Sequence, residues 1–457
     1  MNFDSVIFIS CFLPVVAALY WVIPGIRGKN ILLLVFSLLF YCFAGFSSLF
    51  LLVGLALVNY LLGLWIRSGR GAKPAAVIGF VLNVAFLGLF KYLNFLLNQV
   101  LGLPEVSLGL VVPLGISFFV FKSISYLADL RWGGNNGSFP DFLLYVSFFP
   151  QIVTGPIARF SDFLPQLTER AHSVQAAAAG MKRFVVGLGK KLILSGILGN
   201  MVDSLFALDG SVLNAPLAWL GAVGYCLQQY FDFSGYTDMA IGLGGFFGFT
   251  TVENFDHPYI AVSIGEFWRR WHISLSTWFR DYVYIPLGGN RKGKVRAGLN
   301  KFIVFFLCGL WHGASWTFLL WGVWHGVFSI LESTGIIPAK KLEKHRLVGH
   351  LYTLFVVLIG FVMFRAASVS QGFAFLTAMF TGFSASAQTT VALHQFVTAE
   401  ALVMLVVGAV LCLPLPAKLT GSKLWQSLSH LGCLLLLVLC IIALAAGGFA
   451  PSIYAGF

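Results

Sequence analysis

Two histidines and four tryptophans lie within one stretch that lacks acidic and strongly basic residues, GLWHGASWTFLLWGVWHG, residues 309–326. A neutral imidazole, with a reference pKa of about 6.5, can take a proton from a hydroxyl group at neutral pH. On one continuous helix His312 and His325 would lie about 140° apart and about 19 Å apart along the axis. They could not share a metal ion from such a helix, so each has to be judged by its own neighbours.

The neighbours of the two histidines differ. His312 precedes Gly313, which leaves space beside the ring, and ionisable groups at membrane depth are costly and usually functional. His325 precedes the ordinary apolar run VFSILES, which favours a packing or hydrogen-bonded role. Alone, His312 would leave structural and catalytic roles equally open, but a second histidine, His272, favours catalysis. Three neighbours of His312 are candidate substrate-binding residues: Trp311, Ser315 and Trp316.

The second histidine lies in SIGEFWRRWHISLSTWFRDYVYIPLGG, residues 263–289. Ser263 followed by Glu266 is a capping-box pattern, which predicts a helix that begins there and ends at Pro286. Aromatic residues recur at spacings of three and four, so His272 would lie on an aromatic stripe that faces protein. Three arginines lie on the other side of the predicted helix: Arg269, Arg270 and Arg280. They either anchor the helix to lipid headgroups or bind the phosphates of an anionic donor.

Polar residues interrupt two further apolar regions. Asp232 and Asp238, in YCLQQYFDFSGYTDMAIG, each need a partner, because a carboxylate in the membrane costs about 2.5–3.5 kcal/mol. Pairing with Arg or Lys is at least as well supported as chemistry, although Asp238 and Tyr230 could also line an internal chamber. Gln151, in PQIVTGPIARF, lies either at a helix break or in the same chamber.

The elements that hold these residues are predicted to be membrane helices. The chain has 457 residues, of which 58% are hydrophobic and 10% charged, whereas soluble proteins carry about a quarter charged residues. Apolar runs near the roughly 20 residues needed to cross a bilayer recur throughout. We predict an all-α polytopic membrane protein with about 11–13 membrane segments, some re-entrant. A single domain is expected over 1–457, with scaffold helices at about 1–105, a catalytic core at about 106–335 and C-terminal helices at about 347–457.

The positive charges follow the loops rather than one surface. The basic segments are IRSGRGAKP (66–74), NRKGKVRAGLNK (290–301), PAKKLEKHR (338–346) and PAKLTGSK (416–423), whereas LGLPEVS (101–107) and 382–400 contain no Lys or Arg. This alternation predicts basic loops in the cytoplasm and an extracytoplasmic N-terminus. The net charge of +12 therefore indicates topology and contact with anionic lipids rather than a nucleic-acid partner.

Two other kinds of site are not favoured. The seven cysteines lie in apolar runs without CxxC spacing, which argues against a zinc site or a disulfide framework, and no metal is expected. The sequence contains no G-x-S-x-G nucleophile elbow, H-E-x-x-H pair or P-loop. The first apolar segment lacks a basic start and a cleavage site, so we expect a retained helix rather than a signal peptide.

Five stretches carry a family resemblance. PLGISFF, PQIVTGPI, DFSGYTDMAIG, FWRRWHISLSTWFRDYVYIPLGG and LWHGASWTFLLWG, in this order, resemble the membrane-bound O-acyltransferase family. The bacterial branch that acetylates alginate and cellulose is the most similar, and the D-alanyl transferases of teichoic acids are more distant. The resemblance implies a helical fold in which a cytoplasmic and an extracytoplasmic funnel meet. It matches His312 with the invariant histidine of the family and His272 with the second.

The resemblance also implies a reaction. It is acyl transfer from a cytoplasmic thioester, with acetyl-CoA as the expected donor and no tightly bound cofactor, for O-acetylation of an extracellular polysaccharide such as alginate. The implied location is the bacterial inner membrane, and the implied partners are an SGNH-type acetyltransferase and a polysaccharide synthesis complex. Two alternatives remain open: a transporter of polysaccharide or lipid-linked sugar, and a teichoic-acid D-alanyl transferase.

The apolar run 302–334 poses a problem of length. Basic segments flank it on both sides, which requires an even number of crossings, but 33 helical residues span only about 50 Å. A break near Trp311–Gly313 would resolve this and place His312 near mid-depth. The catalytic hypothesis further requires that both the thioester and the alcohol can reach His312.

Overall fold

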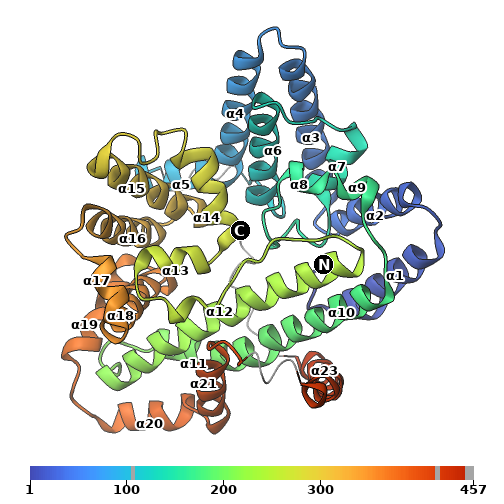
Figure 1. Cartoon of the computed structure of the whole chain (residues 1–457). Coiled ribbons are helices and arrows are strands. Elements are labelled where there is room, and N and C mark those ends of the chain that lie inside the picture. Colours follow the sequence, from blue (N-terminus) through green and yellow to red (C-terminus); the bar gives the residue numbers. More distant parts are fainter. Residues whose placement is uncertain (104–108, 417–421, 448–457) are drawn as a thin grey trace. The chain divides into compact units, whose positions relative to one another are not determined.

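The computed structural model describes residues 1–103, 109–416 and 422–447, and its regular structure is almost entirely helical (Figure 1). Within these ranges the β-pairing is an isolated antiparallel bridge between Phe255 and Trp271. The prediction of an all-α fold is therefore confirmed. The segments LGLPEVS and PAKLTGSK, which carry part of the predicted topology, lie largely outside the described residues.

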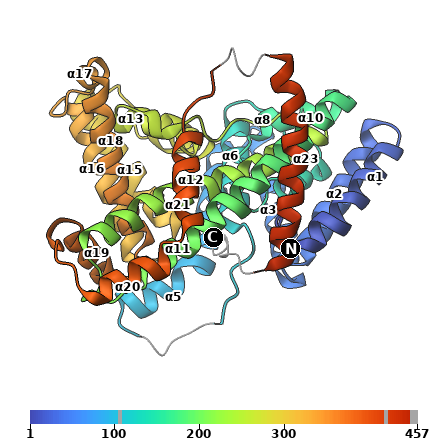
Figure 2. The ribbon, with the colours of Figure 1, turned by 90° about the horizontal axis from the view of Figure 1, so that it is seen from below.

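Long apolar helices identify a multi-pass membrane protein. Among the described residues, five helices are long and apolar enough to cross a bilayer: Phe46–Arg67, Ala72–Val100, Val174–Phe206, Arg346–Arg365 and Ser427–Ala446. The pair Ala387–Phe396 and Ala399–Leu411 makes a sixth if it is one broken span, bent by 69° (Figure 2). The prediction of about 11–13 membrane segments also counted short and re-entrant helices, which are not long enough to be included above. The predicted number of segments therefore stays a prediction.

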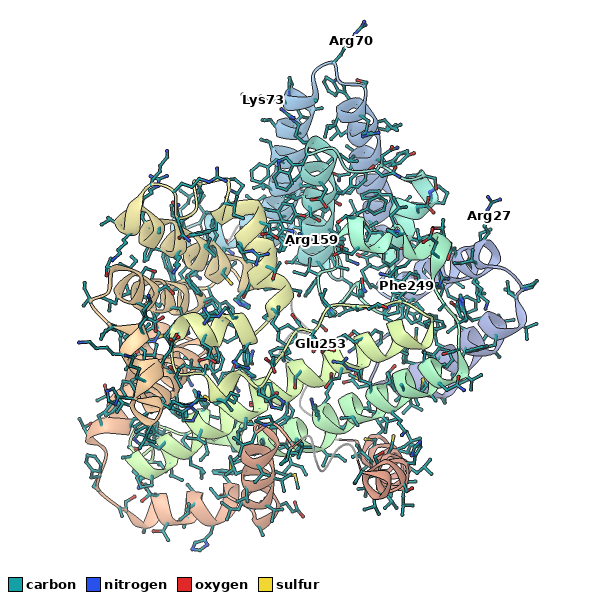
Figure 3. The ribbon with its side chains drawn as sticks, in the orientation of Figure 1. Arg27, Arg70, Lys73, Arg159, Phe249 and Glu253 are labelled. Atoms are coloured by element: carbon teal, nitrogen blue, oxygen red, sulfur yellow. The ribbon has the colours of Figure 1, made fainter. Side chains whose placement is uncertain are left out.

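The helices form two compact units, of which the first comprises residues 1–185 and 236–253. Its helices are α1 (Leu13–Val22), α2 (Ile26–Cys42), α3 (Phe46–Arg67), α4 (Ala72–Leu87), α5 (Leu93–Phe95), α6 (Ile116–Arg131), α7 (Phe139–Ser147), α8 (Phe160–Phe163) and α9 (Gln166–Glu169). Helices α3, α4 and α6 pack against one another, and α7 packs on α2 and α3. At the turn between α3 and α4, Arg70 and Lys73 point away from the protein (Figure 3).

A glycine joins two of the sequence motifs inside this first unit. Gly115, which precedes α6, has a φ of +67°, and a Cβ at this position would lie 2.2 Å from the carbonyl oxygen of Ile152. Only glycine combines this left-handed backbone with so close an approach. The motifs PLGISFF and PQIVTGPI are thereby packed backbone against backbone.

The second unit comprises residues 186–235 and the chain from Asn254 onward. Its helices are α11 (Gly196–Phe206), α13 (Ile264–Arg270), α14 (Ile273–Phe279), α15 (Gly293–His312), α16 (Trp316–Thr334), α17 (Ala339–Lys344), α18 (Arg346–Arg365), α19 (Val369–Thr381), α20 (Ala387–Phe396), α21 (Ala399–Leu411) and α23 (Lys423–Ala446). Two long helices carry residues of both units: α10 (Val174–Gly189) and α12 (Ala215–Phe246).

Short π-helical or 3₁₀ segments occur in both units. They are η1 (Phe8–Phe12), η2 (Gly88–Tyr92), η3 (Leu96–Val100), η4 (Lys190–Ser195), η5 (Pro258–Ile260) and η6 (Arg280–Tyr284).

The run 302–334 is a helical hairpin, as the charge pattern required. Helix α15 ends at His312, Gly313 follows in an extended conformation, and α16 begins at Trp316, which confirms the predicted break. The two helices lie side by side (Figures 1 and 2) because glycines remove side chains from their contact. A Cβ on Gly309 would lie 2.5 Å from the carbonyl oxygen of Phe318, and one on Gly322 would lie 2.5 Å from that of Phe305.

Candidate active site

His272 occupies a break between two short helices. The helix predicted from Ser263 to Pro286 begins as expected, with the Ser263 side chain accepting the N–H of Glu266. The prediction that it continues unbroken was wrong, because the chain leaves the helix at Trp271 and His272 has a left-handed φ of +45°. The preceding segment imposes this break: the N–H of Asp256 donates to the carbonyl of Arg270, and the N–H of Ile273 donates to that of Asn254.

Asn254 sets the orientation of the His272 ring. Its Oδ1 accepts hydrogen bonds from the backbone N–H and the hydroxyl of Ser274, at 3.1 and 2.9 Å, and lies 3.2 Å from Nδ1 of His272. Because the backbone N–H of Ser274 can only donate, the atom facing the imidazole is the amide oxygen, and Nδ1 carries the proton. Nε2 then holds the lone pair, and it is buried without a hydrogen-bond partner in the described part of the chain. Sequence reasoning missed Asn254, since no spacing rule links it to His272.

His312 lies at the end of α15 in a box of aromatic rings and is only 6% exposed. The centroids of Trp321 and Phe364 lie 4.9 and 5.0 Å from its ring. The indole of Trp311 contacts both His312, at 4.9 Å, and His272, at 6.1 Å. The structure therefore brings the two predicted catalytic histidines onto one shared tryptophan.

Two predicted neighbours of His312 have other positions. The Ser315 side chain accepts the N–H of Thr317 and so caps the start of α16. Trp316, the first residue of α16, is 48% exposed. Of the three candidates next to His312, Trp311 packs against both histidines.

A cavity of about 330 Å³ opens beside α13, α14, α15 and α16. It is lined by Gly265, Trp268, Arg269, Leu275, Ser276, Phe279, Arg280, Tyr284, Asn290, Lys301, Val304, Phe305, Cys308, Ser329 and Glu332. The walls combine aromatic rings with three cationic side chains. Both oxygens of Glu332 accept backbone N–H groups, those of Ile264 and Gly265, so this carboxylate caps α13. The cavity thus suits a ligand with anionic and apolar parts.

Two of the three predicted arginines line the cavity, and the third forms ion pairs outside it. Arg269 lines the cavity and forms no ion pair with any residue that the structure describes, while Arg280 lines it and pairs with the adjacent Asp281 at 2.8 Å. Arg270 instead pairs with Glu266 at 3.0 Å and with Asp256 at 2.8 Å, and it is not among the lining residues. Arg270 therefore braces the start of α13 against the preceding segment.

The Glu266 carboxyl has a lowered pKa. Burial alone would raise it, but the hydrogen bond from the Val262 N–H, the hydrogen bond from Arg270 and the charges of Arg270 and Arg269 together bring the pKa below its usual value. The folded protein thus favours the ionised form of Glu266, which accepts hydrogen bonds from Val262 and Arg270 at the start and end of α13.

The cavity approaches His312 without including it. Cys308, which lines the cavity, precedes His312 by four residues on α15, about one helical turn or roughly 6 Å. Neither His312 nor His272 is among the lining residues. The requirement that both substrates reach His312 is therefore not met by this cavity alone.

The remaining predicted site residues have structural partners. Asp232 pairs with Lys191 at 2.6 Å, and Asp238 pairs with Arg183 at 2.8 Å, which confirms that these carboxylates require cations. Arg183 also binds Glu253, labelled in Figure 3. In the first unit, Gln151 accepts from Lys122 and donates to Thr251, both at 3.3 Å. In the second unit, Tyr230 packs against Tyr259 and Trp271, with ring centroids 5.5 and 6.2 Å away. Among the described residues, no group of three His, Cys, Asp or Glu side chains could hold a metal ion.

The sequence of the chain matches a known family. Residues 36–370 match the family model of the membrane-bound O-acyltransferases, so the chain belongs to the membrane-bound O-acyltransferase family. The chain is accordingly an O-acyltransferase, and the transporter alternative is not supported. It is 42% identical over 395 residues to the probable alginate O-acetylase AlgI of Pseudomonas aeruginosa, covering 83% of this chain and 75% of that protein.

Two further relatives carry other acceptors in their names. The chain is 34% identical over 423 residues to the peptidoglycan O-acetyltransferase of Helicobacter pylori, covering 82% of this chain and 79% of the relative. It is 31% identical over 219 residues to the teichoic acid D-alanyltransferase of Bacillus subtilis, covering 45% of this chain and 55% of the relative. Two of the three names give O-acetylation, of alginate or of peptidoglycan, and the third gives D-alanyl transfer to teichoic acid.

Proposed function

We propose that this protein transfers an acetyl group from acetyl-CoA, bound at the cytoplasmic face, toward hydroxyl groups of an extracellular polysaccharide. The relatives named as O-acetylases match over most of the chain, at 42% and 34% identity, whereas the D-alanyltransferase matches over less than half. This difference favours acetyl over D-alanyl transfer.

The observation that carries the proposal is the cationic cavity next to the histidine pair. Arg269, Arg280 and Lys301 provide positive charge for the phosphates of coenzyme A, since guanidinium and ammonium groups bind phosphate oxygens well. Trp268 and Phe305 offer apolar walls for the chain that carries the thioester. The basic segment 290–301 contributes to the lining, and the positive-inside pattern predicts that this segment is cytoplasmic.

In this proposal His312 acts as the general base. It takes the proton of the acceptor hydroxyl as the oxygen attacks the carbonyl carbon of the thioester. The carbon–sulfur bond then breaks, the ester carbonyl re-forms, and the proton passes from His312 to the departing thiolate. His272, held by Asn254 with its Nε2 lone pair available, positions the donor or the acceptor through the shared Trp311 wall. The surrounding aromatic rings exclude water, which would hydrolyse the thioester.

The cellular setting follows from the same proposal. The protein lies in the bacterial inner membrane with an extracytoplasmic N-terminus. An SGNH-type acetyltransferase on the outer side receives the acetyl group and passes it to polysaccharide, such as alginate, made by a neighbouring synthesis complex. The protein itself supplies acetyl groups across the membrane.

The test is the acetate content of the secreted polymer. Cells carrying His312→Ala at normal protein levels should add base-labile acetate to the secreted polymer about 10²–10⁴-fold more slowly than wild-type cells. Losses of this size are typical when a general base is removed. The control is His394→Ala, at an exposed histidine, which should leave acetylation intact. Full acetylation with His312→Ala would reject the assignment, and mass spectrometry of the released acyl group would reveal alanine if the donor were an aminoacyl thioester.

A further inference from the structure

Three side chains between the cavity and His312 have buried polar nitrogens without a hydrogen-bond partner among the described residues. They are Nε1 of Trp268, Nε1 of Trp321 and both ring nitrogens of His325. The His325 side chain has no exposed surface, and Trp321 is 1% exposed. Buried polar groups are nearly always hydrogen-bonded, so several unpaired nitrogens in mutual contact require an explanation. Of the two roles predicted for His325, packing or hydrogen bonding, the structure shows packing: the ring lies against Trp268 and Trp321 and has no hydrogen-bond partner among the described residues.

The three side chains form one cluster. The ring of His325 lies 5.0 Å from that of Trp268 and 5.1 Å from that of Trp321, and the two indoles lie 5.6 Å apart. Trp268 lines the cavity, and Trp321 contacts His312 at 4.9 Å. The cluster therefore bridges the inner wall of the cavity and the proposed general base.

The cluster also continues a polar line along α16. Glu332, Ser329 and His325 follow one another at spacings of three and four residues, and Trp321 is four residues further on, so these residues share one face of the helix. Glu332 and Ser329 line the cavity, whereas His325 and Trp321 lie beyond it. A ligand that entered the cavity would meet this face of α16 on its way to His312.

The chemistry of the cluster selects a ligand group. Indole nitrogens only donate hydrogen bonds, and a neutral imidazole donates one, so the cluster offers donors to an oxygen acceptor. It contains no Lys or Arg, and Phe305 and Phe364 complete its surroundings, with ring centroids 5.2 Å from Trp268 and 5.3 Å from Trp321. An uncharged carbonyl oxygen suits this environment better than a phosphate, which the outer, cationic part of the cavity accommodates.

We propose that Trp268, Trp321 and His325 form an inner subsite that binds the carbonyl oxygen of the acyl thioester. This inference rests on the proposed acyl transfer. When the hydroxyl oxygen attacks the carbonyl carbon, the electron pair of the carbonyl bond moves to this oxygen, and the subsite donors stabilise the resulting negative charge. The pair returns as the carbon–sulfur bond breaks, and the protons of the subsite remain on their nitrogens throughout.

Two tryptophans of α16 provide a matched pair of variants. Nε1 of Trp324 donates to the carbonyl oxygen of Val356 at 2.8 Å, whereas Nε1 of Trp321 has no hydrogen-bond partner among the residues that the structure describes. Trp321→Phe should keep or raise the melting temperature, because it removes an unpaired buried donor, and should slow acyl transfer by about tenfold or more. Trp324→Phe should lower the melting temperature and leave transfer largely intact.

His325→Leu extends the test to the imidazole. We expect an unchanged or higher melting temperature, unchanged binding of acetyl-CoA by the purified full-length protein, and a fall of about 10²–10³-fold in the rate of thiol release from acetyl-CoA. The rate is measured in inside-out membrane vesicles from the polymer-producing cell. His325→Gln restores a donor and should recover part of the rate.

The outcomes separate this inference from the proposed function. If His312→Ala abolishes thiol release while Trp321→Phe and His325→Leu release thiol at the normal rate, the subsite is rejected and the acyltransferase proposal stands. If both subsite variants lose activity and also have a lower melting temperature, the side chains have a packing role, and the subsite is again rejected. If His325→Leu fails to fold, the comparison of thiol release by Trp321→Phe and by Trp324→Phe decides whether the subsite exists. Normal thiol release with His312→Ala would instead reject the proposed function itself.

Discussion

The amide oxygen of Asn254 lies 3.2 Å from Nδ1 of His272 and fixes the imidazole with its proton on that nitrogen. The same oxygen holds the start of α14 through Ser274, so one side chain sets both the helix and the ring. His272 is 1% exposed and contacts Trp311, which in turn contacts His312. The orientation of one histidine is thereby linked to the surroundings of the other.

Replacing Asn254 should reduce transfer through His272. Asn254→Leu removes the acceptor of the Nδ1 proton, and we expect a loss of about tenfold to a hundredfold in polymer acetylation, since small misplacements of a reacting group have effects of this size. Asn254→Asp keeps an acceptor oxygen and is the control, with activity nearer the wild type. Equal acetylation by both variants would show that the tautomer of His272 does not matter.

Arg269 and Arg270 should respond differently although they are adjacent. Arg269→Ala removes a charge from the cavity and should raise the KM for acetyl-CoA by about tenfold, equivalent to about 1.4 kcal/mol, with little change in melting temperature. Arg270→Ala breaks two partly exposed ion pairs and should reduce stability by about 1 kcal/mol or less, with KM unchanged. Thiol release and thermal unfolding measure the two effects, and the reverse pattern would contradict the cavity as the donor site.

The position of the cavity can be tested by labelling a new cysteine. In a chain lacking its native cysteines, Ser276→Cys places a thiol in the lining, and an impermeant maleimide should modify it only from the cytoplasmic side. Acetyl-CoA should slow the reaction at least several-fold. Ser384→Cys, in the segment predicted outside, should react only from the opposite side and without protection. Labelling of both positions from one side would overturn the proposed topology.

The ionised Glu266 should make stability depend on pH. Its pKa is lower in the folded protein than the unfolded value of about 4.3, so its contribution is complete above that value and is lost as the pH falls through the folded pKa. The melting temperature should decrease as the pH falls below the unfolded pKa and through the folded one, and the decrease should be smaller in Glu266→Gln. Identical profiles for wild type and variant would exclude this contribution.

Much of the site could be predicted from local sequence, because the relevant signals are local. The Ser263–Glu266 cap and the glycine after His312 determine where two helices begin and end, and both were predicted correctly. The high cost of carboxylates in apolar surroundings likewise predicted that Asp232 and Asp238 would be paired. Length, composition and motifs were enough to identify a multi-pass membrane protein of this family.

The tertiary structure decided what depends on residues far apart in the chain. The break at Trp271 and His272 arises from pairing with residues 254–256, and this contact overrides the helical periodicity of the segment. Periodicity grouped three arginines on one side, but contacts with Glu266 and Asp256 removed Arg270 from the cavity. The unpaired nitrogens of Trp268, Trp321 and His325 depend on how α13, α15 and α16 pack. Sequence patterns record the preferences of neighbours along the chain, whereas these features follow from which helix faces meet in space.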